Sequence, residues 1–242
     1  MKINIYIDLE SLSRAAADLF VKQSQLSVKK NGRFSVALSG GSTPERTYEL
    51  LAQKPWVDQV PWDKTYIFWG DERCVSVDDI RHNALHANRL LLSHVPIPAS
   101  QIHPIICNQS SRHTAEQYEL LLRDFFKDKE AGFDLMLLGI GNDGHTASLF
   151  PGTPVLSERS KWVSEVSVPS QEFNRVTLTI PLLERSLLTV FLVEGEEKAG
   201  VLKIILEGQR DTSSYPAQLI VPLNNELIWL VDKAAAALLK ND

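Results

Sequence analysis

The chain has 242 residues, 44% of them hydrophobic, with a formal net charge of −5 and a pI near 5.7. This length and apolar content suffice for a full hydrophobic core. The acidic balance, without a block of Lys or Arg, argues against nucleic-acid binding. No apolar run is long enough to cross a membrane, and the first Lys is not followed by an apolar core of the length found in signal peptides, so we expect neither a membrane protein nor a secreted one. Only Cys74 and Cys107 occur, too few for a disulfide framework, which favours a reducing cytoplasm.

Short apolar runs with the character of buried strands alternate with amphipathic stretches along the chain. The expected strands span residues 3–7, 34–38, 65–69, 133–138, 188–193 and 227–231. The expected helices span residues 12–28, 44–52, 83–92, 113–126 and 197–206, with a C-terminal helix at 233–239 behind Asp232 as N-cap. This alternation predicts an α/β fold, with a mostly parallel, doubly wound sheet and helices on both faces. Because no repeat or long linker interrupts the pattern, we expect a single domain over residues 1–242.

The sequence SGGSTPE at residues 39–45 lies directly between an expected strand and an expected helix. Gly40 and Gly41 allow backbone amides to converge, and Ser42 or Thr43 is expected to cap the helix that follows, which suits an anion. No Lys follows the glycines and the spacing is not GxGxxG, so a phosphorylated small molecule is favoured over a nucleotide. The alternative is a purely structural capping box, in which Glu45 pairs with Ser42.

The next expected strand ends in WGDERC at residues 69–74. Charged residues at the carboxyl end of a strand are costly to hold together unless they bind a ligand or pair with one another. Asp71 and Arg73 are therefore candidate ligand-binding residues, and an ion pair between them is the structural alternative. Cys74 lies beside Arg73, whose charge can lower the pKa of a thiol. No partner of a catalytic triad accompanies Cys74, so we expect an inert thiol.

His82 and His86 have the i, i+4 spacing of two metal ligands on one helix face. A hydrolytic zinc motif requires Glu directly after the first His, and Asn83 stands there instead. No further cluster of His or Cys completes a coordination shell. We therefore expect no metal site.

The most informative segment is FDLMLLGIGNDGHTASLFPG at residues 133–152. Its apolar run predicts an interior parallel strand, and its glycines free the backbone for a sharp turn. Residues 146–150 are expected to begin a helix. Asp143 and His145 should then project from the carboxyl end of the sheet, where open α/β folds bind ligands.

Two basic residues lie at further strand ends. Arg175 opens the alternating run 175–180, which predicts an edge strand or an antiparallel strand. Lys198 lies near the start of a helix, where a cation opposes the helix dipole unless an anionic ligand is bound. Either residue alone is more often a solvated surface charge, but their position at strand ends favours the binding of an anion.

Several motifs occur in the same order along the chain as in one known family. They are SGGSTP at 39–44, GDERCV at 70–75, GIGNDGHTASLFPG at 139–152, NRVTLT at 174–179 and EGEEKA at 194–199. Together they resemble the family of 6-phosphogluconolactonases and glucosamine-6-phosphate isomerases. The resemblance implies the fold of the glucosamine-6-phosphate deaminases, hydrolysis of 6-phospho-D-glucono-1,5-lactone to 6-phosphogluconate in the oxidative pentose phosphate pathway, and no metal or organic cofactor. His82 departs from the family pattern, in which serine is common before the asparagine, and the loop 79–81 is atypical.

The resemblance and the residues together indicate how the lactone is opened. We expect His145 to take a proton from water as general base and to return it to the leaving ring oxygen. Asp143 is expected to orient the imidazole or bind sugar hydroxyls, and Arg73 with backbone amides to stabilise the developing oxyanion. The expected substrate- and phosphate-binding residues are Gly40, Gly41, Ser42, Thr43, Asp71, Asn83, Arg175 and Lys198.

Two alternative functions stay open at the level of the sequence. A deaminase/isomerase of amino-sugar phosphates would use a similar phosphate-binding loop, but that family carries tyrosine after its paired acidic residues, where this chain has Arg73. A non-catalytic sugar-phosphate sensor would require a DNA-binding segment, and residues 1–8 are already assigned to the first strand. The sequence leaves the oligomeric state open.

Overall fold

The computed structural model describes residues 1–127, 132–169, 171–223 and 226–240. Its main element is a six-stranded sheet with the strand order β1-β9-β8-β5-β2-β3, in which neighbouring strands are parallel. The strands are β1 (Lys2–Tyr6), β2 (Phe34–Leu38), β3 (Thr65–Trp69), β5 (Leu135–Leu138), β8 (Leu188–Val193) and β9 (Glu226–Asp232). The predicted parallel α/β architecture is therefore confirmed.

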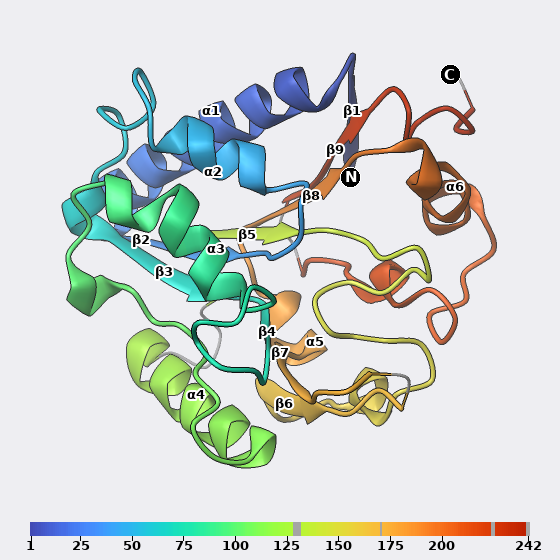
Figure 1. The fold of residues 1–242 in the computed structure, drawn as a ribbon. Coiled ribbons are helices and arrows are strands. Elements are labelled where there is room, and N and C mark those ends of the chain that lie inside the picture. Colours follow the sequence, from blue (N-terminus) through green and yellow to red (C-terminus); the bar gives the residue numbers. More distant parts are fainter. Residues whose placement is uncertain (128–131, 170, 224–225, 241–242) are drawn as a thin grey trace.

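Helices lie on both sides of this sheet, with α1 and α2 on one side and α4 on the other (Figure 1). The helices are α1 (Leu9–Asn31), α2 (Glu45–Leu51), α3 (Asn83–Leu90), α4 (Ser111–Phe126), α5 (Ile180–Leu183) and α6 (Ala199–Glu207). The ring of Phe20 in α1 meets that of Phe34 in β2 edge-on, with 5.3 Å between centroids. The ring of Phe126 in α4 contacts Phe133 just before β5 in the same way. None of the helices within the described ranges has the length and apolar character needed to cross a bilayer.

A second, three-stranded antiparallel sheet has the order β4-β7-β6. Its strands are β4 (Asp71–Arg73), β7 (Arg175–Leu178) and β6 (Val163–Val166). The strand predicted at 175–180 is antiparallel, as expected, but it forms the centre of this sheet rather than an edge. Its pairing places Arg73 opposite Arg175, so β4 and β7 bring charged residues from two distant parts of the chain to one place.

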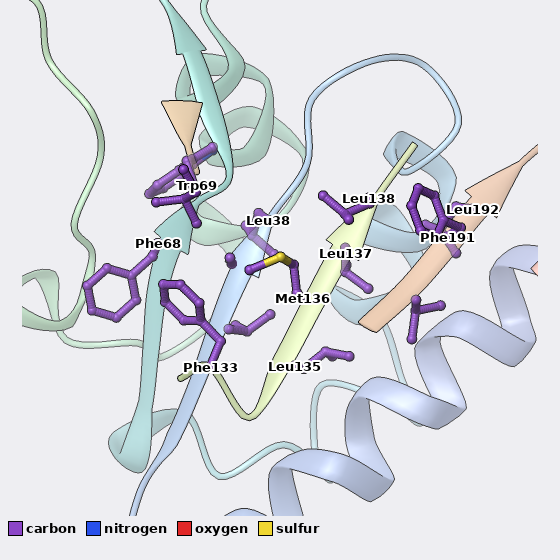
Figure 2. Close-up of a cluster of buried hydrophobic side chains, with 14 of the residues drawn as sticks. Leu38, Phe68, Trp69, Phe133, Leu135, Met136, Leu137, Leu138, Phe191 and Leu192 are labelled. Atoms are coloured by element: carbon purple, nitrogen blue, oxygen red, sulfur yellow. The ribbon is translucent and has the colours of Figure 1, made fainter. Parts of the chain in front are cut away.

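Figure 2 shows the core of the main sheet, where apolar side chains of β2, β3, β5 and β8 gather. Leu135, Met136, Leu137 and Leu138 are at most 1% exposed. Both faces of these strands are covered, which explains why their sequences are apolar at successive positions rather than alternating. The buried strands give the loops at their carboxyl ends a rigid base.

The helix predicted at 233–239 is wrong, because these residues form successive turns. Asp232 Oδ1 accepts a hydrogen bond from Ala235 N at 2.7 Å, as an N-cap would. The amides of Ala237 and Leu239, however, donate to carbonyls three residues back, which is the spacing of tight turns and not of an α-helix. A cap and good helix formers were therefore not sufficient for a helix at this end of the fold.

The helix start predicted at 146–150 is also wrong. Ala147 has a φ of 48°, in the left-handed region, and Thr146 takes part in an isolated antiparallel bridge. Tertiary hydrogen bonds explain this course, since Thr146 Oγ1 donates to a carbonyl of the preceding turn and Ser148 N donates to Thr177 Oγ1 in β7. These contacts outweigh local helix propensity.

The carboxyl ends of β8, β5, β2 and β3 lie next to one another at one edge of the main sheet. From β2 the chain continues outward to β3, whereas from β5 it runs the other way to β8 and β9. The strand order thus reverses between β2 and β5, and such a switch point is where open α/β folds hold their ligands. The loops that flank it are residues 39–44 and 139–145.

Candidate active site

A cavity of about 280 Å³ lies at this switch point. The loops after β2, β5 and β8 form its wall together with β4, the start of α3 and the first residue of β7. The predicted site residues that line it are Gly40, Gly41, Ser42, Thr43, Asp71, Arg73, Asn83, His145, Arg175 and Lys198. The remaining predicted residue, Asp143, contacts His145. The fold therefore brings the residues that the sequence singled out to one place.

His145 and Asp143 form a carboxylate–histidine pair at the cavity wall. Nδ1 of His145 lies 2.5 Å from Oδ1 of Asp143, and the imidazole stacks on Phe150 with 4.1 Å between ring centroids. The hydrogen bond with His145 is the main cause that holds the pKa of Asp143 below its ordinary value. Because the carboxylate engages Nδ1, Nε2 is the ring nitrogen that can serve a ligand in the cavity.

Gly141 and Gly144 make this pair possible. Gly144 has a φ of 80°, in the left-handed region that favours glycine. A Cβ atom on Gly141 would lie only 2.1 Å from Nδ1 of His145, so a larger residue does not fit there while the pair is kept. Gly141 N also donates to the carbonyl oxygen of His145 at 2.8 Å, which closes the turn. The glycines therefore provide both the turn and the space for the imidazole.

The loop after β2 approaches the cavity with its backbone. Gly41 has a φ of 91°, and Gly40 lies so close to Asn83 that a Cβ atom would be 1.9 Å from the amide oxygen of that side chain. Asn83 Nδ2 donates to the carbonyl oxygen of Asp71 at 3.0 Å. The loop, the start of α3 and β4 thus meet at Asn83.

The helix cap predicted in this loop is wrong. Neither Ser42 nor Thr43 caps α2 with its side chain, because Pro44 is the N-cap residue and α2 begins at Glu45. Ser42 contributes only its carbonyl oxygen, which accepts a hydrogen bond from Glu45 N at 3.1 Å. The proline occupies the place that a capping hydroxyl would need. The hydroxyl groups of Ser42 and Thr43 are therefore not committed to capping and can serve a ligand.

Asp71 pairs with Arg175 rather than with Arg73. Arg175 Nη1 lies 3.7 Å from Asp71 Oδ2, and Ser148 Oγ donates to the same oxygen at 2.5 Å. Arg73 instead donates from Nη1 to the carbonyl oxygen of Arg81 at 2.5 Å. Its Nε is buried and has no hydrogen-bond partner among the described residues. Arg73 nevertheless lines the cavity, where a guanidinium suits an anionic ligand.

Lys198 lies in the short 3₁₀ helix Glu196–Lys198, directly before α6. Its Nζ donates to Asn142 Oδ1 at 2.6 Å, which ties the loop after β8 to the loop after β5. Glu194 and Glu197 line the same cavity, and burial is the main cause that raises the pKa of Glu194. Sequence reasoning assigned these two glutamates no role, although their position at the end of a strand was a signal that could have identified them.

Cys74 and Cys107 form a disulfide, with 5.2 Å between their Cα atoms. The expectation of an inert free thiol at Cys74 is therefore wrong, and the two cysteines no longer support a reducing compartment. They lie 33 residues apart, and no local pattern indicates that the segment after β4 runs beside the segment that precedes α4. The disulfide attaches the residue next to Arg73 to that second segment.

His82 and His86 do not converge on one point. His82 directly precedes α3 and is buried, with Nδ1 3.2 Å from Oε2 of Glu72. His86 lies within α3, with Nδ1 3.0 Å from Oε1 of Glu45. In the part of the chain that the structure describes, no group of three His, Cys, Asp or Glu side chains is placed to hold a metal ion. The contact between Glu72 and His82 was missed by sequence reasoning.

The fold and the cavity define a class of α/β proteins with a cavity lined by charged residues at a switch point of the sheet. The chain belongs to the family described as glucosamine-6-phosphate isomerases/6-phosphogluconolactonase, whose model matches residues 7–229. The resemblance that the motifs indicated is therefore confirmed.

Relatives and solved structures agree with this assignment. The chain is 39% identical over 239 residues to a protein of Synechocystis sp. (strain ATCC 27184 / PCC 6803 / Kazusa) named 6-phosphogluconolactonase. The match covers 97% of this chain and 96% of that protein. The present structure superimposes on the 6-phosphogluconolactonase from Trypanosoma brucei with a TM-score of 0.85 at 26% identity, over 99% of this chain and 98% of that one. A monomeric glucosamine-6-phosphate deaminase shares the fold, with a TM-score of 0.83 at 24% identity over 98% and 100% of the two chains.

Proposed function

We propose that the protein hydrolyses 6-phospho-D-glucono-1,5-lactone to 6-phosphogluconate, the lactonase step of the oxidative pentose phosphate pathway. The observation that carries the proposal is the pair of His145 and Asp143 at a cavity that three cationic side chains also line. These cations are Arg73, Arg175 and Lys198. A lactone is an activated ester, so its opening requires a positioned water, a base and donors for an oxyanion. The cavity wall offers a residue for each requirement.

The phosphate group of the substrate is proposed to lie between the loop after β2 and two cations. Backbone amides and hydroxyls of Gly41, Ser42 and Thr43 would donate to it from one side, and Arg175 and Lys198 would do so from the other. Charge-assisted hydrogen bonds of this kind are the strong ones, and arginine and lysine are the usual partners of phosphate. The proposed substrate-binding set is completed by Gly40, Asp71 and Asn83.

His145 is the proposed general base. Its Nε2 accepts a proton from water while the water oxygen attacks C1 of the lactone, and Asp143 keeps Nδ1 protonated and stabilises the imidazolium that forms. The bond between C1 and the ring oxygen of the tetrahedral adduct then breaks, and the imidazolium returns the proton to that ring oxygen. Arg73 is proposed to stabilise the negative charge on the C1 oxygen, because its guanidinium is the cation that β4 contributes to the cavity wall.

The test measures acid release from freshly prepared lactone, with the uncatalysed rate subtracted because such lactones open slowly without enzyme. Ammonia release from glucosamine 6-phosphate is measured in parallel, since a deaminase/isomerase shares the fold. We expect acid release and no ammonia. Ammonia release without lactone opening would replace the proposal by that alternative, and turnover of neither substrate would favour a sugar-phosphate sensor.

We also propose that the reaction needs neither a metal ion nor an organic cofactor. The base, the donors and the phosphate ligands assigned above are all side chains or amides of this chain. Dialysis against a strong chelator should therefore leave kcat unchanged. Loss of activity that zinc restores would contradict this part of the proposal.

The cytoplasm is the compartment that we propose, because the expected substrate is a phosphorylated intermediate of central carbohydrate metabolism. The disulfide between Cys74 and Cys107 makes the compartment a question for experiment. Cell fractionation, with thiols alkylated at the moment of lysis, would report both the location of the protein and its thiol state there.

A further inference from the structure

Helix α3 begins without a cap of its own. Its first residue is Asn83, and the residue before it, His82, makes no capping hydrogen bond with its side chain. The first amides of a helix have no partner within the helix, and Ser, Thr, Asp or Asn usually satisfies them from this position. Buried amides without a partner are costly. Another part of the fold must therefore supply the cap.

Glu72 of β4 supplies it. Oε1 of Glu72 accepts hydrogen bonds from Asn83 N and from Arg73 N, both at 2.8 Å. Oε2 accepts a hydrogen bond from Ala84 N at 2.9 Å, and Nδ1 of His82 lies 3.2 Å from this oxygen. The side chain of Glu72 is fully buried. One carboxylate thus fixes the end of β4 and the start of α3 at the same time.

Both fixed points belong to the cavity wall, whereas Glu72 does not line the cavity itself. Arg73 is a cation of the cavity wall, and Asn83 contacts both Gly40 and the carbonyl oxygen of Asp71. A shift of Asn83 would therefore also release the loop after β2. The carboxylate of Glu72 affects a ligand only through the residues that it holds.

We propose that Glu72 is a positioning residue of the active site, which holds Arg73 and Asn83 in the geometry that the substrate requires. The proposal rests on the lactonase function proposed above. Displacement of a reacting group by about 1 Å can cost on the order of a hundredfold in rate, so a residue outside the cavity can still control turnover.

The experiment compares Glu72→Gln with Asp134→Asn. Asp134 is the matched control, a buried carboxylate that accepts hydrogen bonds from Ser35 N and Ser35 Oγ, both at 2.8 Å. It directly precedes β5, at the opposite edge of the sheet from the cavity. Both substitutions replace a buried carboxylate by an amide and should lower Tm. We expect Glu72→Gln alone to lower kcat/KM for the lactone, by about ten- to a hundredfold. Equal kcat/KM in the two variants would overturn the proposal.

A double variant separates positioning from stability. Adding His82→Ser to Glu72→Gln gives α3 an N-cap of its own, because a serine hydroxyl at this position can accept from the amides of the first turn. If Glu72 positions the start of α3, the double variant should regain at least about threefold in kcat/KM over Glu72→Gln, as a typical cap is strong enough to do. A gain in Tm without a gain in kcat/KM would assign Glu72 to stability alone and overturn the proposal.

Glu72→Asp takes the place of Glu72→Gln if the latter does not fold. The shorter side chain keeps the charge but cannot reach the amides of the strand and of the helix together. A loss of about tenfold or more in kcat/KM supports the positioning role, and unchanged kcat/KM overturns it. A wild-type protein without lactonase activity would overturn the proposed function instead, so the two failures are distinguishable.

Discussion

The loop after β5 and the stretch from β4 to the start of α3 each contain a carboxylate close to a histidine. In the loop after β5, the side chains of His145 and Asp143 are 26% and 50% exposed, and their nearest atoms lie 2.5 Å apart. In the other segment, the side chains of His82 and Glu72 are 3% and 0% exposed, with 3.2 Å between the nearest atoms. The same two kinds of side chain thus occupy opposite environments, one pair at the cavity and the other buried behind its wall.

These environments decide what each pair can do. The hydrogen bond with His145 holds the pKa of Asp143 below its ordinary value. Burial raises the pKa of Glu72 to about 7, although three backbone amides that donate to it oppose the rise. A pair that faces the cavity can pass a proton to a ligand, whereas a pair sealed from solvent can only hold the backbone. Exposure to the cavity, and not residue type, separates the proposed catalytic pair from the proposed positioning residue Glu72 and its histidine neighbour.

His145→Ala breaks the exposed pair and should have the largest effect. A positioned general base contributes about 10² to 10⁴ in rate, so kcat should fall by that order with a much smaller change in KM. Steady-state kinetics, with the uncatalysed rate subtracted, measures both constants. A folded His145→Ala protein with near-normal kcat would mean that His145 only fixes the loop through its bond to Asp143.

Lys198→Ala tests the cation that Asn142 ties to the same loop. Losing one charge-assisted contact costs roughly 1.5 to 3 kcal/mol, so KM for the lactone should rise about ten- to a hundredfold. Lys203→Ala is the matched control, because Lys203 Nζ contacts the carbonyl oxygen of Leu238 and the residue does not line the cavity.

The lactone without its phosphate sharpens this test. It should be a poor substrate of the wild type, and its kcat/KM should be insensitive to Lys198→Ala, because the proposed partner of Lys198 is missing. Equal kcat/KM for the two lactones in the wild type would contradict the phosphate site as a whole. An unchanged KM for the phosphorylated lactone in Lys198→Ala would remove only this residue from it.

The main sheet could be predicted from the sequence because its signal is local. Strands β2, β3 and β8 begin and end where their apolar runs do, since parallel strands covered on both faces are apolar at every position. Strand β4 has the sequence DER and no such signal. It forms because its backbone pairs with β7, which lies far along the chain. The second sheet was therefore not predicted.

The same difference between local and long-range contacts decides which parts of the site could be predicted. His145 and Asp143 lie two residues apart beside glycines, so their proximity follows from local sequence. Glu72 and His82 meet only because α3 packs against β4, and the sequence shows no more than a charged residue after a strand and a histidine before a helix. The disulfide joins two loops whose proximity depends in the same way on the finished fold.

Cys107→Ser tests how firmly the segment after β4 is held. The disulfide links residues 33 positions apart, and such a link typically contributes about 2 to 4 kcal/mol, so Tm should fall by several degrees. We expect kcat to stay within about twofold, because Glu72 still holds Arg73 N without the disulfide. Thermal unfolding with and without a dithiol reductant measures the effect. The Tm of the wild type should fall on reduction, and the Tm of Cys107→Ser should not change. A wild-type Tm that the reductant leaves unchanged would contradict a stabilising disulfide.

The pH dependence of stability tests the buried pair and should give the smallest effect. The pKa of Glu72 lies at about 7 in the fold and ordinarily at 4.5, so the folded state binds the proton more tightly than the unfolded chain. The free energy of unfolding should therefore fall as the pH rises from about 4.5 to about 7, by on the order of 1 to 3 kcal/mol from this group. Glu72→Gln removes this contribution and should show a flatter curve in denaturant unfolding.

The comparison of the two curves isolates Glu72 from its charged surroundings. The groups that face it are Asp71, Arg73, His82, Tyr118 and Arg175. Burial lowers the pKa of His82, so the folded state disfavours its protonation and His82 adds a slope of the opposite sign. Because His82 is present in both proteins, the difference between the curves contains the contribution of Glu72 and its coupling to His82, and not the burial of the imidazole itself. Asp134→Asn should keep the wild-type slope, since it leaves Glu72 intact. Parallel curves for the wild type and Glu72→Gln would mean that Glu72 is ionised in the fold as easily as in water, and that the two pairs do not differ in environment as their burial indicates.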